Sequence, residues 1–207
     1  MSKGKFIVIA LFALIVLLMI LKQDPSQMQR TPLEPGSKIV AFGDSLTYGK
    51  GATMHSYPIQ LQMLLNLKVI NEGQSGEPSS KGLIRLVSVL EEHKPDLIIL
   101  CHGGNDLIQQ TSKETLRSNI IKMIRLSKQS GAEVLLVGVP NFKLIRFSTE
   151  PLYEEIAKEE GIMYEGDILS KIENDTSLKS DRIHPNARGY GLMAEAFYKT
   201  LKDNGLL

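Results

Sequence analysis

Short apolar runs alternate with longer amphipathic segments along most of the chain, and this alternation restricts the folds that it can adopt. The apolar runs lie at residues 38–42, 68–71, 96–101, 133–139 and, more weakly, 162–164. Continuous apolar character in the first, third and fourth runs is typical of strands that a parallel sheet buries on both faces. The pattern therefore predicts five strands.

The amphipathic segments between these runs carry apolar residues at helical spacing, together with boundary signals. Pro151 and Gly161 flank one of them, as expected for a helix with proline in its first turn and glycine after its last. The predicted helices span residues 57–67, 79–93, 113–129, 151–160 and 186–203. Alternation of strands and helices indicates an open sheet with helices on both faces. We predict an α/β fold, a three-layer αβα sandwich around a mostly parallel five-stranded sheet of the flavodoxin-like type.

The amino terminus has a composition of its own. Lys3 and Lys5 precede an unbroken apolar run at residues 6–21, which polar residues then end. A basic flank, an apolar stretch and a polar exit are typical of a signal peptide or a signal anchor, and the run has about the shortest length that spans a bilayer. Because no small-residue cleavage pattern follows, we favour an uncleaved hydrophobic helix that anchors the protein in a membrane. Secretion after signal cleavage is the alternative.

This terminus also sets the predicted organisation of the chain. We expect a signal anchor or transmembrane segment at residues 1–22, a proline-containing linker at residues 23–37 and one globular domain at residues 38–207. Basic residues before a first apolar segment favour an amino end inside the cell and a domain outside the cytoplasm.

Composition argues against several partners. The formal net charge is only +1 and the chain has no tryptophan, so neither electrostatics nor base stacking favours nucleic acid. The single cysteine, Cys101, cannot form an intrachain disulfide. His102 follows it directly, and neighbouring residues of a strand point to opposite faces. We interpret both as core residues and predict no metal site.

Four short motifs stand after predicted strands or just before the last predicted helix. They read GDSL at 43–46, NEGQSG at 71–76, GGND at 103–106 and DRIHP at 181–185. The first three follow the first three strands, and the carboxyl ends of parallel strands meet at one edge of a sheet. We therefore expect the motifs to form one site.

The residue types in these motifs are those that nucleophilic catalysis needs. Ser45 supplies a hydroxyl nucleophile, His184 a general base that later acts as an acid, and Asp181 a carboxylate that orients the imidazole. Each has a plainer interpretation when taken alone, because Ser45 suits a helix N-cap and the other two suit a solvated turn. The combination favours a catalytic site.

Donors for a developing oxyanion are present as well. The candidates are the backbone N–H groups of Ser45 and Gly76 and the side-chain amide of Asn105, since a glycine lets a substrate oxygen approach the backbone closely. Taken alone, the segment around Asn105 is also compatible with a plain turn. Thr47 stands where a Gly-x-Ser-x-Gly pattern has its second glycine, which disfavours an ordinary α/β-hydrolase.

Together the four motifs resemble those of the GDSL lipases, or SGNH hydrolases, and the similarity extends from the first predicted strand to the end of the chain. It is closest to the single-domain bacterial type with thioesterase, arylesterase and lysophospholipase activities. The resemblance implies that the invariant Ser, Gly, Asn and His of the family fall on Ser45, Gly76, Asn105 and His184. The family's Asp falls on Asp181. It also implies ester or thioester hydrolysis through an acyl-enzyme, for which we expect no cofactor. The amino-terminal anchor, which departs from the cleaved signal of the soluble members, would place the domain in the bacterial periplasm or at the outer cell surface.

The segment after the fourth predicted strand, residues 141–147, is rich in large apolar side chains. We interpret Phe142 and Phe147 as an apolar wall for an acyl chain, with Lys143 and Arg146 beside it for an anionic head group. The alternative is that the apolar residues begin the next helix and pack on the sheet. For the esterase we expect lipid-like or small acyl substrates, and the wall predicts a preference for medium acyl chains or lysophospholipid over bare acetyl esters. A carbohydrate O-acetylesterase of cell-envelope glycans is the alternative function, and a catalytically silent, membrane-tethered binding module is a weaker one.

Overall fold

The computed structural model describes residues 30–141 and 147–207, and residues 1–29 and 142–146 lie outside this part. Within it, strands and helices alternate as the sequence pattern predicts. The strands are β1 (Ile39–Gly43), β2 (Val69–Gly73), β3 (Leu97–Cys101), β4 (Glu133–Val137) and β5 (Met163–Glu165). The longer helices are α3 (Tyr57–Leu65), α4 (Ser79–His93), α6 (Lys113–Gln129), α7 (Leu152–Glu160) and α9 (Ala187–Asp203).

The strands form a single sheet in the order β2-β1-β3-β4-β5, and every neighbouring pair is parallel. In β1, Ile39 stands opposite Val69 of β2 on one side and Leu97 of β3 on the other. All residues of β1 and β3 are buried, whereas the edge strand β2 is buried only at its first residue. The central position of β1 and β3 explains their continuous apolar sequences, and the predicted parallel α/β fold is confirmed.

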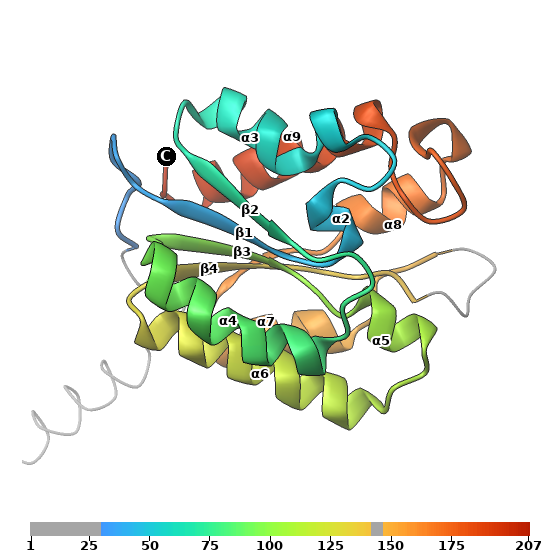
Figure 1. Ribbon diagram of the computed structural model, residues 1–207, viewed down its shortest axis with the longest axis horizontal. Coiled ribbons are helices and arrows are strands. Elements are labelled where there is room, and N and C mark those ends of the chain that lie inside the picture. Colours follow the sequence, from blue (N-terminus) through green and yellow to red (C-terminus); the bar gives the residue numbers. More distant parts are fainter. Residues whose placement is uncertain (1–29, 142–146) are drawn as a thin grey trace, which may run out of the picture.

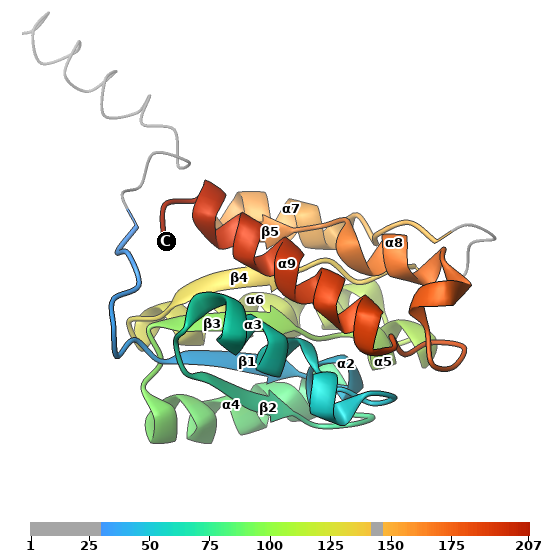
Figure 2. The ribbon, with the colours of Figure 1, turned by 90° about the horizontal axis from the view of Figure 1, so that it is seen from above.

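Helices cover both faces of the sheet (Figure 1). The α3 and α9 helices pack against each other on one face, and α4, α6 and α7 form the layer on the other. Figure 2 shows α3 and α9 side by side when the molecule is seen from above. The α9 helix turns an apolar stripe toward the sheet, with Tyr190, Met193 and Phe197 all buried.

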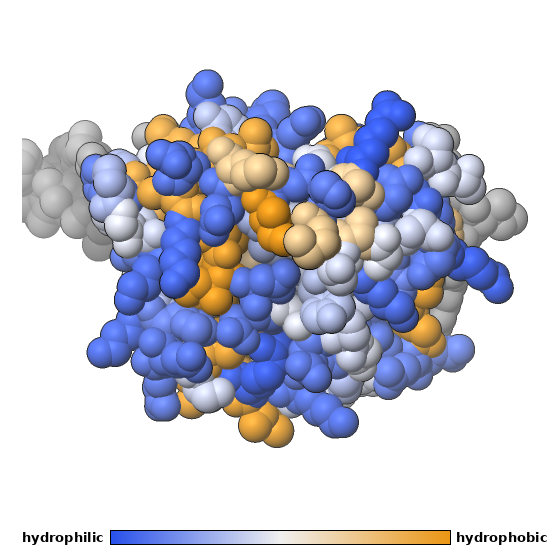
Figure 3. Space-filling model, turned by 45° about the horizontal axis from the view of Figure 1, so that its top comes forward, coloured by the Kyte–Doolittle hydropathy of each residue, from blue (hydrophilic) through white to orange (hydrophobic). Residues whose placement is uncertain are grey.

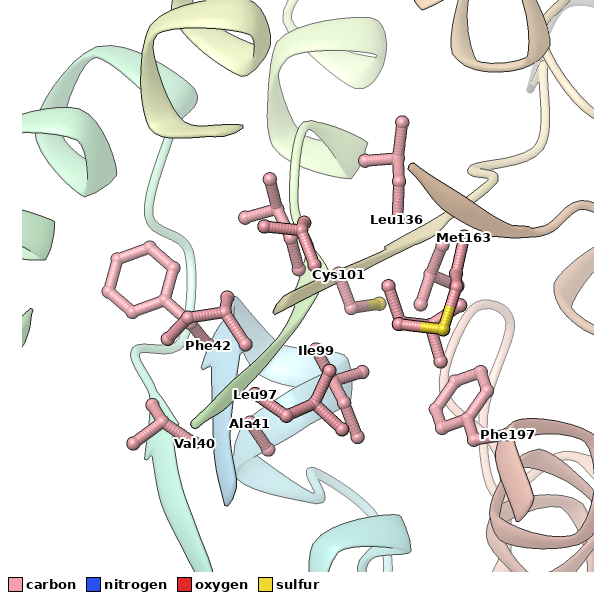
Figure 4. Packing of buried hydrophobic residues seen from close by; sticks show 14 of the residues in the cluster. Val40, Ala41, Phe42, Leu97, Ile99, Cys101, Leu136, Met163 and Phe197 are labelled. Carbon is pink, nitrogen blue, oxygen red and sulfur yellow. The ribbon is translucent and has the colours of Figure 1, made fainter. Parts of the chain in front are cut away.

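The core lies on both sides of the sheet. Figure 4 shows part of it, in which side chains of β1, β3, β4 and β5 gather with Phe197 of α9. The ring of Tyr57 meets that of Phe197 edge to face, with centroids 5.0 Å apart. Its hydroxyl lies 2.9 Å from the Thr47 hydroxyl, so a buried polar atom is satisfied within an otherwise apolar layer.

Three short helices add to the predicted elements, all close to the carboxyl edge of the sheet. They are α2 (Ser45–Tyr48), α5 (Gly104–Ile108) and α8 (Ile168–Glu173), and they are accompanied by the 3₁₀ turns η2 (Thr53–His55) and η3 (Thr176–Leu178). Each spans fewer than two helical turns, so no repeating apolar pattern marks it in the sequence.

The outer surface on the α3 side mixes apolar and polar residues. Figure 3 shows hydrophobic residues scattered among hydrophilic ones on this side of the molecule. On α3, Ile59, Met63 and Leu64 are exposed, which accounts for the weak amphipathic pattern of this helix.

The hydrophobic helix expected at the amino terminus lies outside the described residues. Among the helices of residues 30–141 and 147–207, none combines the length and the apolar character that crossing a bilayer requires. From Arg30 onward the chain lies against the domain. The Arg30 guanidinium pairs with Glu133 at 2.8 Å, and the Leu33 N–H donates to the Leu206 carbonyl at 2.9 Å. The boundary between linker and domain stays a prediction.

Candidate active site

Neighbouring strands bring three of the motifs to one edge of the sheet. Ser45 follows β1, Gly76 follows β2 and Asn105 follows β3, and these strands are adjacent in the order β2-β1-β3. Asp181 and His184 join them from the loop before α9. The sheet topology therefore accounts for the meeting of residues that are far apart in the chain.

Ser45, His184 and Asp181 form a continuous hydrogen-bonded chain. The Ser45 Oγ atom lies 3.0 Å from His184 Nε2, and His184 Nδ1 lies 2.7 Å from Asp181 Oδ2. The His184 side chain is only 9% exposed, whereas that of Asp181 is 48% exposed. This arrangement can pass a proton from the hydroxyl to the imidazole and hold the imidazolium that results.

The local structure at the start of α2 leaves the Ser45 hydroxyl available to His184. Asp44 is the N-cap of α2, and its Oδ1 atom accepts a hydrogen bond from the Leu46 N–H at 3.1 Å. Ser45 is the first helical residue, so the alternative that it serves as the N-cap is wrong. The backbone N–H of a first helical residue has no acceptor within its own helix, which leaves this donor open toward a ligand.

Asp181 is held in its ionised form by donors from its own loop. Its Oδ1 atom accepts from the backbone N–H groups of Ile183 and His184, both at 2.8 Å. Desolvation opposes ionisation, but these N–H donors and the imidazole outweigh it and hold the pKa of Asp181 below its usual range. An ionised Asp181 keeps the His184 proton on Nδ1 and leaves the Nε2 lone pair facing Ser45.

Gly76 has the backbone conformation and the open surroundings expected of an oxyanion donor. Its φ angle is +78°, in the region that favours glycine. A Cβ atom added at this position would meet nothing within 4 Å. Within the part of the chain that the structure describes, its N–H donates to no backbone acceptor outside the regular elements.

The Asn105 amide already has two acceptors. Its Nδ2 atom donates to Asp44 Oδ2 and to the Glu77 carbonyl, both at 3.1 Å. Because an amide nitrogen carries two hydrogens, a substrate oxygen would have to share or replace one of these acceptors. Burial raises the pKa of Asp44, because ionising a buried carboxyl group costs free energy. The hydrogen bond from Asn105 offsets part of this cost. The role of Asn105 toward an oxyanion stays a prediction.

A cluster of Glu77, Arg85 and His102 next to Gly76 is the main feature that the sequence does not predict. The Glu77 carboxylate accepts from Arg85 Nη2 at 2.8 Å and from Arg85 Nε at 3.0 Å, and it lies 3.2 Å from His102 Nε2. His102 Nδ1 accepts from the Gly103 N–H at 3.0 Å, which leaves Nε2 to donate to Glu77. The cluster ties the loop that carries Gly76 to both α4 and the end of β3.

Replacing Glu77 should change how stability depends on pH. Burial opposes ionisation of Glu77, but bonds from His102 and Arg85 outweigh it and lower its pKa from 4.5 to about 2. A carboxylate whose pKa is lower in the folded than in the unfolded protein stabilises the fold at pH values above its unfolded pKa. This contribution is lost as the pH falls through its folded pKa. The wild type should thus lose about 3 kcal/mol more unfolding free energy than Glu77→Gln between pH 4.5 and about 2.

Urea unfolding at a series of pH values measures this difference. Glu92→Gln, at an exposed position of α4, is the control and should follow the wild type. Parallel curves for the wild type and Glu77→Gln would contradict the assignment of a stabilising carboxylate.

Of the two aromatic residues expected to bind substrate, Phe147 lies within the described residues. Phe142 lies outside the described residues. Phe147 is half-buried, and its ring centroid lies 5.7 Å from Lys179 Nζ. Lys179 Nζ in turn donates to the Arg182 carbonyl at 3.0 Å, which places Phe147 on the Asp181–His184 side of the site.

An open hollow of about 780 Å³ adjoins Phe147. Its lining combines the Phe147 and Tyr164 rings with hydroxyl and charged side chains, among them Ser170 and Lys171. A mixed lining of this kind does not by itself select a long acyl chain.

His102 is fully buried, as expected of a core residue, and its ring stacks on Phe42 at 5.8 Å between centroids. Within residues 30–141 and 147–207, no three His, Cys, Asp or Glu side chains are grouped so that they could hold a metal ion.

Comparison with known proteins places this geometry in a family. A family profile described as GDSL-like Lipase/Acylhydrolase matches residues 41–192. The chain is similar to an arylesterase of Vibrio mimicus, with 28% identity over 173 residues that cover 78% of this chain and 86% of the relative. It is also similar to a protein of Escherichia coli (strain K12) described as Thioesterase 1/protease 1/lysophospholipase L1, with 26% identity over 176 residues, or 79% and 83% of the two chains.

A solved structure described as the crystal structure of TesA superposes with a TM-score of 0.72 at 26% identity, covering 81% of this chain and 99% of the other. The profile match includes Ser45, Gly76, Asn105, Asp181 and His184 and spans well over half of the chain. The chain therefore belongs to the GDSL-like lipase/acylhydrolase family of ester hydrolases.

Proposed function

We propose that this chain hydrolyses acyl esters or thioesters through an acyl-enzyme formed on Ser45. The observation that carries the proposal is the unbroken chain from Ser45 Oγ to His184 Nε2 at 3.0 Å and from His184 Nδ1 to Asp181 Oδ2 at 2.7 Å. These distances support the roles of nucleophile, base and orienting acid that acyl transfer needs.

The reaction follows from this geometry. His184 Nε2 takes the Ser45 hydroxyl proton while Oγ attacks the acyl carbon. The carbonyl oxygen becomes an oxyanion that accepts hydrogen bonds from the N–H groups of Ser45 and Gly76 and from the Asn105 amide. The bond to the alcohol or thiol then breaks as His184 protonates the leaving group. Water attacks the acyl-enzyme in the same way, which releases the acid and restores Ser45.

Hydrolysis of p-nitrophenyl acetate and butyrate by the purified domain tests the proposal. The wild type should hydrolyse both esters well above the rate of Ser45→Ala. Equal rates for the two proteins would remove Ser45 from the reaction and with it the proposed function.

For the substrate we propose medium-length acyl groups, as in lipid-like esters or lysophospholipids. Support comes from the apolar ring of Phe147 beside the Asp181–His184 loop, and from the lysophospholipase description of the Escherichia coli relative. Phe142, for which the same role is proposed, adds a second ring close by in the sequence.

An acyl-length series of p-nitrophenyl esters from two to sixteen carbons checks this preference. The expected optimum lies at medium length, and Phe147→Ala should lower kcat/KM for the optimal ester by about tenfold, the size of one lost apolar contact, while acetate is little affected. Phe142→Ala should act in the same direction. A strict acetyl optimum that neither variant changes would favour the carbohydrate O-acetylesterase of cell-envelope glycans.

We also propose that residues 1–22 anchor the protein in a membrane, with the domain outside the cytoplasm. The proposal rests on the basic flank and the apolar run of this segment. In cell fractionation, the full chain should sediment with membranes and a chain that begins at Arg30 should not. A full chain found entirely in the soluble fraction would favour signal cleavage and secretion.

A further inference from the structure

The geometry points to Lys179 as a positioning residue for the proposed site: through one peptide group, its ammonium holds the Asp181 carboxylate against His184. The inference rests on the catalytic roles proposed above for Asp181 and His184. Lys179 is outside the four motifs and lies in the loop between η3 and α9. Its contacts come from this loop, from Glu173 of α8 and from Phe147.

This loop is short and closed at its base. Lys179 and Pro185 form an antiparallel bridge, and the Ser180 N–H donates to the His184 carbonyl at 2.9 Å. Asp181 and His184 therefore stand within one tight turn, whose shape sets the distance between carboxylate and imidazole.

The Lys179 side chain folds back across the turn instead of extending into solvent. It is only 9% exposed, and its Nζ atom donates to Glu173 Oε2 at 2.9 Å and to the Arg182 carbonyl at 3.0 Å. The ring of Phe147 lies near it, with its centroid 5.7 Å away. A carboxylate, a carbonyl and an aromatic ring thus surround the ammonium and restrict its position.

The Arg182 carbonyl and the Ile183 N–H belong to the same peptide group. Lys179 contacts the oxygen of this group, and the nitrogen donates to Asp181 Oδ1 at 2.8 Å. A cation at the oxygen polarises the amide and strengthens the bond that its N–H makes. The ammonium thus acts on Asp181 through the peptide without touching it, and Asp181 passes the constraint to His184 Nδ1.

Glu173 fixes the other side of Lys179. It lies in the last turn of α8, its side chain is 6% exposed, and burial raises its pKa despite the bond from Lys179. Removing Lys179 alone would leave Glu173 as an unpaired buried acid. The charges that act on His184 come from its own loop, from α8 and from the end of β1, and they are Asp181, Glu173 with Lys179, and Asp44.

A purely structural ion pair makes different predictions from a positioning residue. If the pair only stabilises the fold, its replacement lowers the melting temperature but leaves the turnover of each folded site unchanged. If Lys179 acts through the peptide, turnover falls even where folding is intact. The state of the His184 Nδ1 proton should change at the same time.

The experiment compares Glu173→Gln with the double variant Lys179→Met/Glu173→Gln, which removes both charges and leaves no unpaired acid. Glu173→Gln keeps an acceptor for the ammonium and should retain wild-type kcat. The double variant should lose about tenfold in kcat per titrated active site, the size of one charge-assisted hydrogen bond, with KM little changed.

A second measurement needs no substrate. Proton NMR of the full domain should show the His184 Nδ1 proton far downfield in the wild type and in Glu173→Gln, and weaker or shifted upfield in the double variant. A folded double variant with wild-type kcat and an unchanged proton signal would overturn the role of Lys179. Absence of Ser45-dependent hydrolysis in the wild type would instead overturn the proposed function, so the two failures are distinct.

Discussion

Ser45→Ala should lower kcat/KM for p-nitrophenyl butyrate by roughly 10⁴–10⁶-fold. The substitution removes the nucleophile that lies 3.0 Å from His184 Nε2 and leaves the base without a proton to take. Binding and oxyanion stabilisation remain, because the Ser45 N–H belongs to the backbone and Gly76 and Asn105 are untouched. The KM should therefore change far less than kcat.

The fold should tolerate this substitution, since the start of α2 is capped by Asp44 and not by Ser45. Ser80→Ala, at an exposed serine in the first turn of α4, is the matched control and should retain full activity. Residual hydrolysis by Ser45→Ala near the wild-type rate, with an intact melting transition, would show that another group is the nucleophile.

Asp181→Asn should lower kcat by roughly 10²–10⁴-fold, because an amide cannot satisfy the three donors that surround this side chain. Asp181 accepts at Oδ1 from the Ile183 and His184 N–H groups and at Oδ2 from His184 Nδ1. If the Asn oxygen keeps the two backbone bonds, its NH₂ group faces Nδ1 and drives the imidazole proton to Nε2. The imidazole then presents a proton to Ser45 instead of a lone pair. The partial exposure of Asp181 lets water relieve some of this conflict.

Asp175→Asn offers a control in a similar setting. Asp175 also accepts from a backbone N–H two residues later in the chain, that of Ser177 at 2.9 Å. It is the N-cap of η3, whereas Asp181 and His184 lie in the loop that follows η3. Its replacement should leave kcat unchanged. Unchanged kcat in Asp181→Asn, with a normal melting temperature, would remove Asp181 from the mechanism.

The sheet and its long helices could be predicted because their signals are local. Buried central strands require continuous apolar runs, and α7 is bounded by Pro151 and Gly161 as the sequence indicates. The placement of Ser45, Gly76 and Asn105 follows from the same pattern, because parallel strands deliver their carboxyl ends to one edge. Ser45 and His184 lie 139 positions apart in the chain, and their meeting is predicted by the combination of the four motifs and its resemblance to a known family.

Contacts between distant polar side chains could not be predicted in this way. Glu77 and His102 are 25 positions apart, and His93 lies 2.9 Å from Glu72 across 21 positions. A single sequence gives no sign of such pairs, since each residue alone suits an exposed helix or loop. The sequence gives no sign of the positioning role proposed for Lys179 either, because that role depends on a side chain that folds back onto the Arg182 carbonyl.

The most direct test of the central claim is the covalent labelling of Ser45. The purified domain should react with a fluorophosphonate probe, and peptide mass spectrometry should find the adduct on Ser45. Labelling should be lost in Ser45→Ala and strongly slowed in His184→Ala, because the base that activates the hydroxyl is then absent. A folded domain that the probe does not modify, as expected of a silent binding module, or that it modifies at another residue, would contradict the account.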